Sequence, residues 1–126
     1  MHLLVIGGVA TGTKVAAKFK RLNRGAHVTV LNKTQDISYA GCGLPYYVGG
    51  MIESRDELIV NTPAKYSALT GVEVLTGREV TSLDPQGRTA VARNLATGQE
   101  ETYAYDACVI AVGASPAAPP VPGVDL

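Results

Sequence analysis

The first thirty residues constrain the fold more than any other part of the chain. Residues 2–6 are apolar and end at a pair of glycines, which is the pattern of a buried strand entering a tight turn. From Thr13 to about Asn23 apolar side chains recur at helical spacing, and the β-branched run 27–31 follows. A strand, a helix and a second strand of this length cross over right-handed into a parallel sheet, so the chain is predicted to begin as an α/β unit.

The rest of the chain predicts more strands around one short helix. Residues 63–70 begin with proline, which suits the first position of a helix. Strand patterns separated by turn residues then predict an antiparallel meander over about 72–105, and 107–112 is a further apolar strand. The meander strands are expected at 72–75, 79–83, 89–94 and 101–104. We therefore predict one domain over 1–113 and a proline-rich connector over 114–126 that leads to a further domain.

Charge and cysteine content exclude several classes of partner. Eleven basic and eleven acidic residues cancel, so neither a nucleic acid nor a membrane surface is predicted as a partner, and no metal site is predicted. Two cysteines without a signal peptide predict a cytoplasmic protein. The six basic residues from Lys14 to Lys33 all precede the first acid, Asp36. This local positive charge indicates either an anionic ligand or a solvated helix face.

The glycine turn has most of the features of a dinucleotide-binding fingerprint. Its segment reads GGVATG, with the first and third glycines of the fingerprint in place and Val9 in the slot of the second. The amides that begin the following helix offer donors to a phosphate without needing a particular side chain. The alternative is a glycine turn that serves packing alone. The candidate phosphate-binding residues are Gly7, Gly8, Val9, Ala10, Thr11 and Gly12.

A second unusual segment surrounds Cys42, where glycines and a proline predict irregular backbone. Residues 37–50 read ISYAGCGLPYYVGG, and they resemble the single-cysteine branch of the FAD-dependent pyridine nucleotide-disulfide oxidoreductases. This branch includes coenzyme A-disulfide reductases, NADH oxidases and peroxidases, and persulfide reductases. The resemblance extends along the whole chain, through VIGGVATG, AAKFKRLN, VTVLNK and YDACVIAVGASPAAPPVPGV.

The resemblance implies a Rossmann-like three-layer domain that binds FAD, with NAD(P)H bound by a domain outside this chain. It makes Cys42 the redox-active thiol. Dithiol members carry a second cysteine where Tyr47 stands, so the resemblance implies chemistry through a sulfenic acid or a mixed disulfide. The alternative is that Cys42 is a small buried apolar residue. Cys108 lies within an apolar strand and is assigned to the core.

Further site residues follow from the resemblance. At the end of the second strand, where the fingerprint has an acid that binds the ribose, the chain has Asn32. A neutral amide predicts a weaker hold on the adenosine, so Asn32→Asp or Asn32→Glu is expected to tighten flavin binding. Additional FAD contacts are expected at Lys33, Val80, Ala111 and Gly113, and coenzyme A or another substrate at Lys18, Lys20, Arg21 and Ser38.

The predicted function is NAD(P)H-driven, FAD-dependent reduction of a low-molecular-weight disulfide or persulfide. Coenzyme A disulfide is favoured because Ala10 stands where the resembling oxidases and peroxidases carry a histidine. The alternatives are an NADH oxidase or peroxidase, and a non-catalytic nucleotide-binding module in which Val9, Asn32 and Val112 mark lost flavin binding. The resemblance further implies a homodimeric parent protein, of which this segment alone is not expected to turn over NAD(P)H.

Overall fold

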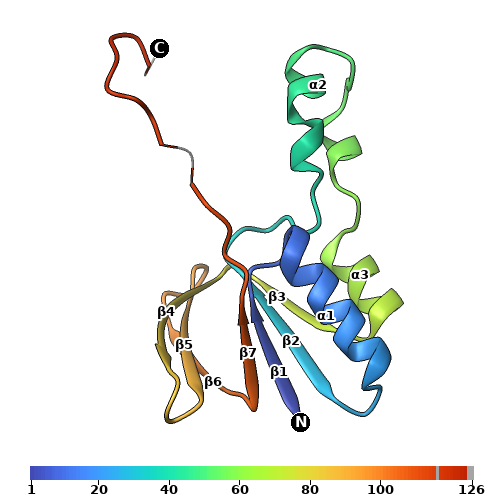
Figure 1. Cartoon of the computed structure of the whole chain (residues 1–126), viewed down its shortest axis with the longest axis vertical. Helices are drawn as coiled ribbons and strands as arrows, with labels where there is room; N and C mark the ends of the chain where they lie inside the picture. Colours follow the sequence, from blue (N-terminus) through green and yellow to red (C-terminus); the bar gives the residue numbers. More distant parts are fainter. Residues whose placement is uncertain (116, 125–126) are drawn as a thin grey trace.

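The fold consists of three layers, and a computed structural model describes it for residues 1–115 and 117–124. Figure 1 shows two helices on one face of a parallel sheet and a small antiparallel sheet on its other face. The predicted α/β architecture with a parallel sheet and an antiparallel insertion is confirmed. In chain order the elements are β1 His2–Ile6, α1 Ala10–Leu22, β2 His27–Asn32, α2 Leu44–Val48, α3 Pro63–Thr70, β3 Glu73–Thr76, β4 Arg78–Asp84, β5 Thr89–Asn94, β6 Glu100–Ala104 and β7 Ala107–Ile110.

The parallel sheet has the order β3-β2-β1-β7, which places β1 at its centre. Because successive side chains of a strand point to opposite faces, β1 contributes to two separate cores. Leu3 and Val5 pack with Ala16 of α1 on the helix side. Leu4 packs with Ala90 of β5 between the two sheets. The uninterrupted apolar composition of β1 therefore reflects burial on both faces.

The antiparallel sheet has the order β4-β5-β6 and is smaller than predicted. The sequence pattern predicts a strand at 72–75 as part of this meander, and that prediction is wrong. Its counterpart β3 lies in the parallel sheet, where Thr29 of β2 pairs with Glu73. The physical reason is that β3 follows helix α3, and a helical crossover returns the chain parallel to its sheet, whereas a hairpin turn would reverse it. The meander itself begins at β4.

Residues 39–59 form a projecting segment that we call the cysteine lobe. It contains the 3-10 turn Gly41–Gly43, helix α2 and a second 3-10 turn, Arg55–Leu58. A bridge between Tyr39 and Ile59 closes its base. In Figure 1 the lobe extends beyond the N-terminal end of α1, on the side of the sheet where the parallel strands end. In open α/β sheets that edge is where ligands bind.

Beyond β7 the described residues 112–115 and 117–124 are all exposed. The predicted connector over 114–126 also includes Pro116, Asp125 and Leu126, which lie outside the described residues. Within the described part of the chain, no helix combines the length and the apolar character that a membrane crossing requires.

Candidate functional site

The glycine turn between β1 and α1 depends on the absence of side chains at two positions. Gly7 has φ of 103°, in the left-handed region that glycine tolerates, and a Cβ there would overlap the carbonyl oxygen of Ala111. A Cβ on Gly12 would overlap the carbonyl oxygen of Gly7. The turn therefore brings three backbone segments together at one point, and Ala111 at the end of β7 lies against it.

Helix α1 begins at Ala10, three residues before the predicted start, and no side chain caps it. Its N-cap residue is Val9, and its first turn contains no acidic residue. The first N–H groups of a helix have no partner within the helix and carry the positive end of its dipole. The exposed residues Ala10 and Thr11 thus begin a helix of 13 residues that is suited to bind an anionic group.

The side chain of Asn32 is buried and fully engaged within the protein. Its Oδ1 accepts the N–H of Gly8 at 2.9 Å. Its Nδ2 lies 2.9 Å from the carbonyl oxygen of Thr34, 3.0 Å from the Thr34 hydroxyl and 3.0 Å from the carbonyl oxygen of Asp36. Asn32 therefore links the glycine turn to the bend at 34–36. The structure gives it a positioning role, which differs from the ribose contact that the sequence suggests.

A groove of about 400 Å³ runs from the glycine turn across the ends of the strands. The turn, the end of β2, the start of β4 and the residue after β7 all contribute to its lining. Its walls include Gly7, Val9, Asn32, Lys33, Glu79, Val80 and Val112. The groove thus brings together predicted cofactor residues from the glycine turn, the end of β2 and β4, while after β7 it is lined by Val112, between the predicted Ala111 and Gly113. Gly8 does not line the groove. Its N–H donates to Asn32, and its Cα faces the side chains of Ile37 and Asn32.

Two charged residues of this groove were missed at the level of sequence, and both belong to β4. Arg78 donates to Glu101 through Nε at 3.0 Å and through Nη2 at 3.2 Å. These bonds, with those from Tyr103 and Asn94, hold the pKa of Glu101 at about 2. Glu79 pairs with Lys33 at 2.8 Å, and the Lys33 ammonium lowers the pKa of the Glu79 carboxyl. The only sequence signal was their place directly after Gly77, at the start of a strand.

Cys42 lies exposed in the 3-10 turn of the cysteine lobe, so its interpretation as a buried apolar residue is wrong. The residue that precedes the lobe connects it to the glycine turn. Ser38, four residues before the cysteine, donates its N–H to the carbonyl oxygen of Gly8 at 2.9 Å. Ser38 adopts φ of 51°, an uncommon value for a residue with a side chain. Its carbonyl oxygen accepts the N–H of Val60 at 3.2 Å, so the residues just before and just after the lobe are hydrogen-bonded to each other.

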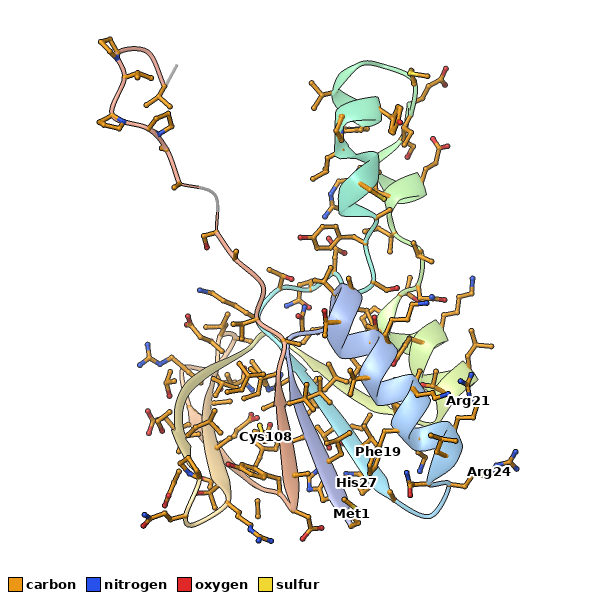
Figure 2. The ribbon with its side chains drawn as sticks, in the orientation of Figure 1. Met1, Phe19, Arg21, Arg24, His27 and Cys108 are labelled. Atoms are coloured by element: carbon orange, nitrogen blue, oxygen red, sulfur yellow. The ribbon has the colours of Figure 1, made fainter. Side chains whose placement is uncertain are left out.

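The second cysteine has a different environment. Cys108 packs between the two sheets, in the cluster of Leu4, Leu31 and Ala90. Figure 2 shows it on the side of β7 that faces the antiparallel sheet. Burial raises the pKa of its thiol, which makes the reactive thiolate scarcer. The prediction that Cys108 belongs to the core is confirmed.

The basic residues of α1 fall into two groups. Lys18 and Arg21 line an open groove along α1 with Lys14. Lys20 lies elsewhere, because its ammonium donates to the carbonyl oxygens of Arg24 at 3.0 Å and Ala26 at 2.6 Å. Lys20 therefore closes the turn between α1 and β2, and its role as a substrate ligand stays a prediction. Figure 2 places Arg21 near the end of α1 that is distant from the lobe.

Comparison with known proteins identifies the family. A profile described as pyridine nucleotide-disulphide oxidoreductase matches residues 1–126. This chain belongs to that family. The NADH oxidase of Enterococcus faecalis is 33% identical over 125 residues, which are 99% of this chain and 28% of that protein. The coenzyme A disulfide reductase of Staphylococcus epidermidis is 32% identical over 113 residues, 90% of this chain and 26% of that protein.

Two solved structures of reductases superpose closely on this chain. The reduced Bacillus anthracis CoADR-RHD superposes with a TM-score of 0.92 at 34% identity, over 98% of this chain and 22% of that one. The NAD-dependent persulfide reductase from A. fulgidus also has a TM-score of 0.92, at 37% identity, over 99% of this chain and 23% of that one. The chain thus spans about a quarter of the length of its relatives.

Members of the pyridine nucleotide-disulphide oxidoreductase family bind FAD and NAD(P)H, and a similar NADH oxidase from Lactobacillus brevis was solved with NADH bound. The residues of this chain fit the dinucleotide part of FAD. The uncapped start of α1 provides donors for a pyrophosphate, and the bare glycine turn allows a close approach. The adjoining groove extends from that turn to Val80 on β4.

Proposed function

We propose that this chain provides the FAD-binding and thiol-bearing part of an NAD(P)H-driven reductase of low-molecular-weight disulfides or persulfides, with coenzyme A disulfide as the favoured substrate. One observation carries the proposal. The exposed thiol of Cys42 lies in a lobe whose preceding residue, Ser38, donates its N–H to Gly8 in the glycine turn of the dinucleotide groove. Tyr39, at the base of the lobe, also lines the groove, which supports a route between the thiol and the flavin site.

The proposed role of Cys42 is nucleophilic attack on the substrate. Its thiolate attacks one sulfur of a disulfide RSSR, which forms a mixed disulfide and releases the other sulfur as a thiolate that takes up a proton. FAD, when bound, supplies two electrons that derive from the hydride of NAD(P)H. Together with a second proton, these electrons cleave the mixed disulfide, release the second thiol and restore Cys42. The balance is NAD(P)H + H⁺ + RSSR → NAD(P)⁺ + 2 RSH.

The surroundings of Cys42 support a single-thiol route. The residue five positions later is Tyr47, and the other cysteine of the chain is held between the sheets. A mixed disulfide with a small thiol needs access from solvent, which the exposed position of Cys42 supplies. The half-buried Ser38 lies beside the glycine turn at the base of the same lobe, so a substrate contact there remains part of the proposal.

The favoured substrate is supported by the positive side of α1. Lys14, Lys18 and Arg21 are spaced by four and three residues, so they share one face of the helix and line one open groove. Phosphate groups such as those of coenzyme A are suited to this stripe, and Lys18 and Arg21 are the proposed contacts. Lys18→Met and Arg21→Met are expected to raise KM for coenzyme A disulfide while leaving KM for NADH unchanged.

The test is a flavin titration of the full-length polypeptide that carries this segment. Reduction by NADH is expected to bleach the flavin spectrum and to produce long-wavelength absorbance that Cys42→Ser abolishes. Cys108→Ser is the matched control, since it changes the half-buried cysteine between the sheets and should preserve that absorbance. A colourless protein, or a long-wavelength band that survives Cys42→Ser, would refute the proposal.

NADH oxidase is the second candidate, because the relative with that name is 33% identical and the coenzyme A disulfide reductase 32%, so identity does not separate them. The same preparation distinguishes the two activities. Oxygen consumption with NADH alone supports the oxidase, whereas turnover that requires added coenzyme A disulfide supports the reductase. Ala10 favours the reductase, since a methyl group cannot transfer a proton.

A further inference from the structure

The adenosine end of the groove lacks the acid that the dinucleotide fingerprint normally places at the end of the second strand. Asn32 occupies that position, where its amide is only 5% exposed and is held by hydrogen bonds within the protein. Its oxygen accepts from Gly8, and its two N–H groups are shared among acceptors on Thr34 and Asp36. A ribose in this groove therefore needs another acceptor for its hydroxyl groups.

Glu79, at the start of β4, has the carboxylate that position 32 lacks. It lines the same groove as Asn32, and its side chain is 35% exposed. The Lys33 ammonium contacts its Oε1 at 2.8 Å. A carboxylate has about four lone-pair positions, so one ion pair leaves acceptor capacity for the hydroxyls of a ribose. The pairing with Lys33 keeps the carboxyl ionised, because its pKa is lowered.

The neighbouring cation does not neutralise Glu79. Arg78 lines the groove as well, but its guanidinium binds both oxygens of Glu101 and donates through Nη1 to the carbonyl oxygen of Thr76 at 3.0 Å. Glu101 is itself held by Asn94 and Tyr103. Each cation at this end of the groove thus has its own acid. Arg78 is fixed by Glu101, and Glu79 forms its ion pair with Lys33, while Arg93, opposite it on β5, adds a weaker electrostatic attraction.

We propose that the carboxylate of Glu79, oriented by Lys33, is the acceptor for the ribose hydroxyls of the adenosine in FAD, in place of an acid at position 32. This inference rests on the proposed flavin site. It transfers ribose recognition from the end of β2 to the start of β4, across the same groove. The ion pair between Lys33 and Glu79 then joins the two walls between which the ribose lies.

The test compares two small probes that differ in the ribose hydroxyls. Calorimetry with the apoprotein measures the Kd of ADP and of 2′,3′-dideoxyadenosine diphosphate. The wild-type protein is expected to prefer ADP by about tenfold, which corresponds to about 1.4 kcal/mol. In Glu79→Gln this preference should fall below about twofold, because the charge-assisted hydrogen bond is lost. Glu100→Gln is the matched control, since Glu100 is exposed on β6 and does not line the groove.

The outcomes separate this inference from the proposed function. If neither ADP nor FAD binds to the wild-type protein, the flavin site and this inference both fail. If both bind but the wild-type protein does not discriminate between the two diphosphates, only the role of Glu79 is refuted, whether or not the variant folds. A preference that survives in a folded Glu79→Gln variant refutes it equally, and thermal unfolding of each variant confirms its folding.

Discussion

The substitution Asn32→Asp discriminates between the sequence-based and the structure-based interpretation of the second strand. The fingerprint predicts tighter flavin binding, because an acid would be restored. The structure predicts a loss of stability. An aspartate retains the acceptor for the Gly8 N–H, but it cannot donate to the Thr34 hydroxyl or to the carbonyl oxygens of Thr34 and Asp36.

The magnitude follows from the two N–H donors that are lost and from the burial of the new charge. Two hydrogen bonds contribute about 1 kcal/mol each. Asn32 is only 5% exposed, so an ionised carboxylate there would also lose hydration beside two carbonyl oxygens. We expect Asn32→Asp to lower the free energy of unfolding by about 2–4 kcal/mol at pH 7, and Tm by about 10 °C. Flavin affinity should fall, because the glycine turn loses its link to the bend at 34–36.

Thermal unfolding at several pH values provides the assay. Burial should raise the pKa of the new carboxyl above its unfolded value of about 3.9. Its protonated form can donate one hydrogen bond, so the loss should be largest above the raised pKa and should shrink as the pH falls through it. Asn23→Asp is the matched control, because the Asn23 amide makes one exposed bond, to Phe19 at 3.2 Å. A variant at position 32 that is as stable as wild type, or that binds FAD more tightly, would refute the positioning role.

Three further substitutions test other parts of the site. Gly12→Ala should destabilise the fold by more than about 2 kcal/mol in denaturant titrations, because the new methyl group overlaps a backbone carbonyl of the turn; retained stability would contradict that packing. The folded pKa of Glu101 is about 2, so the stability that its carboxylate contributes is lost as the pH falls from about 4.5 to 2. Glu101→Gln should therefore remove the part of the acid unfolding transition in that pH range. An unchanged acid transition would show that Glu101 does not contribute to it. Lys20→Met should cost about 1 kcal/mol of stability while Lys18→Met costs little, and equal losses would argue against the turn-closing bonds of Lys20.

Local signals predicted the parts of the fold that local chemistry determines. Proline at the first position of α3 and the glycine pair after β1 each act on their own segment, and both elements occur as predicted. The apolar composition of β1 indicated burial on both faces, which its central place in the parallel sheet confirms, whereas the equally apolar β7 lies at the edge and is only partly buried. The exposed cysteine segment was also recognisable, because its glycines and proline bracket Cys42.

Features that depend on distant partners could not be read in this way. The four residues of β3 have a strand pattern, but nothing within them indicates whether β2 or β4 is the neighbour. The spacing of Asn32 from the glycine turn suggested a ligand, whereas its role depends on a bend that turns two carbonyl groups toward it. Lys20 resembles its basic neighbours on the helix, and only the path of the chain after α1 brings carbonyl oxygens within its reach.

The central position of β1 has a consequence for how this domain acquires its structure. One edge of β1 pairs with β2, which follows the first helix, whereas the other edge pairs with β7, near the end of the domain. The hydrogen bond from the His2 N–H to Asp106 joins residues 104 positions apart. Contacts of such long range slow folding, since a large loop must close before they form. During synthesis the open edge of β1 is a site for mispairing with other chains. The antiparallel hairpins made just before β7 shorten the effective loop, so their early formation would protect the nascent domain from aggregation.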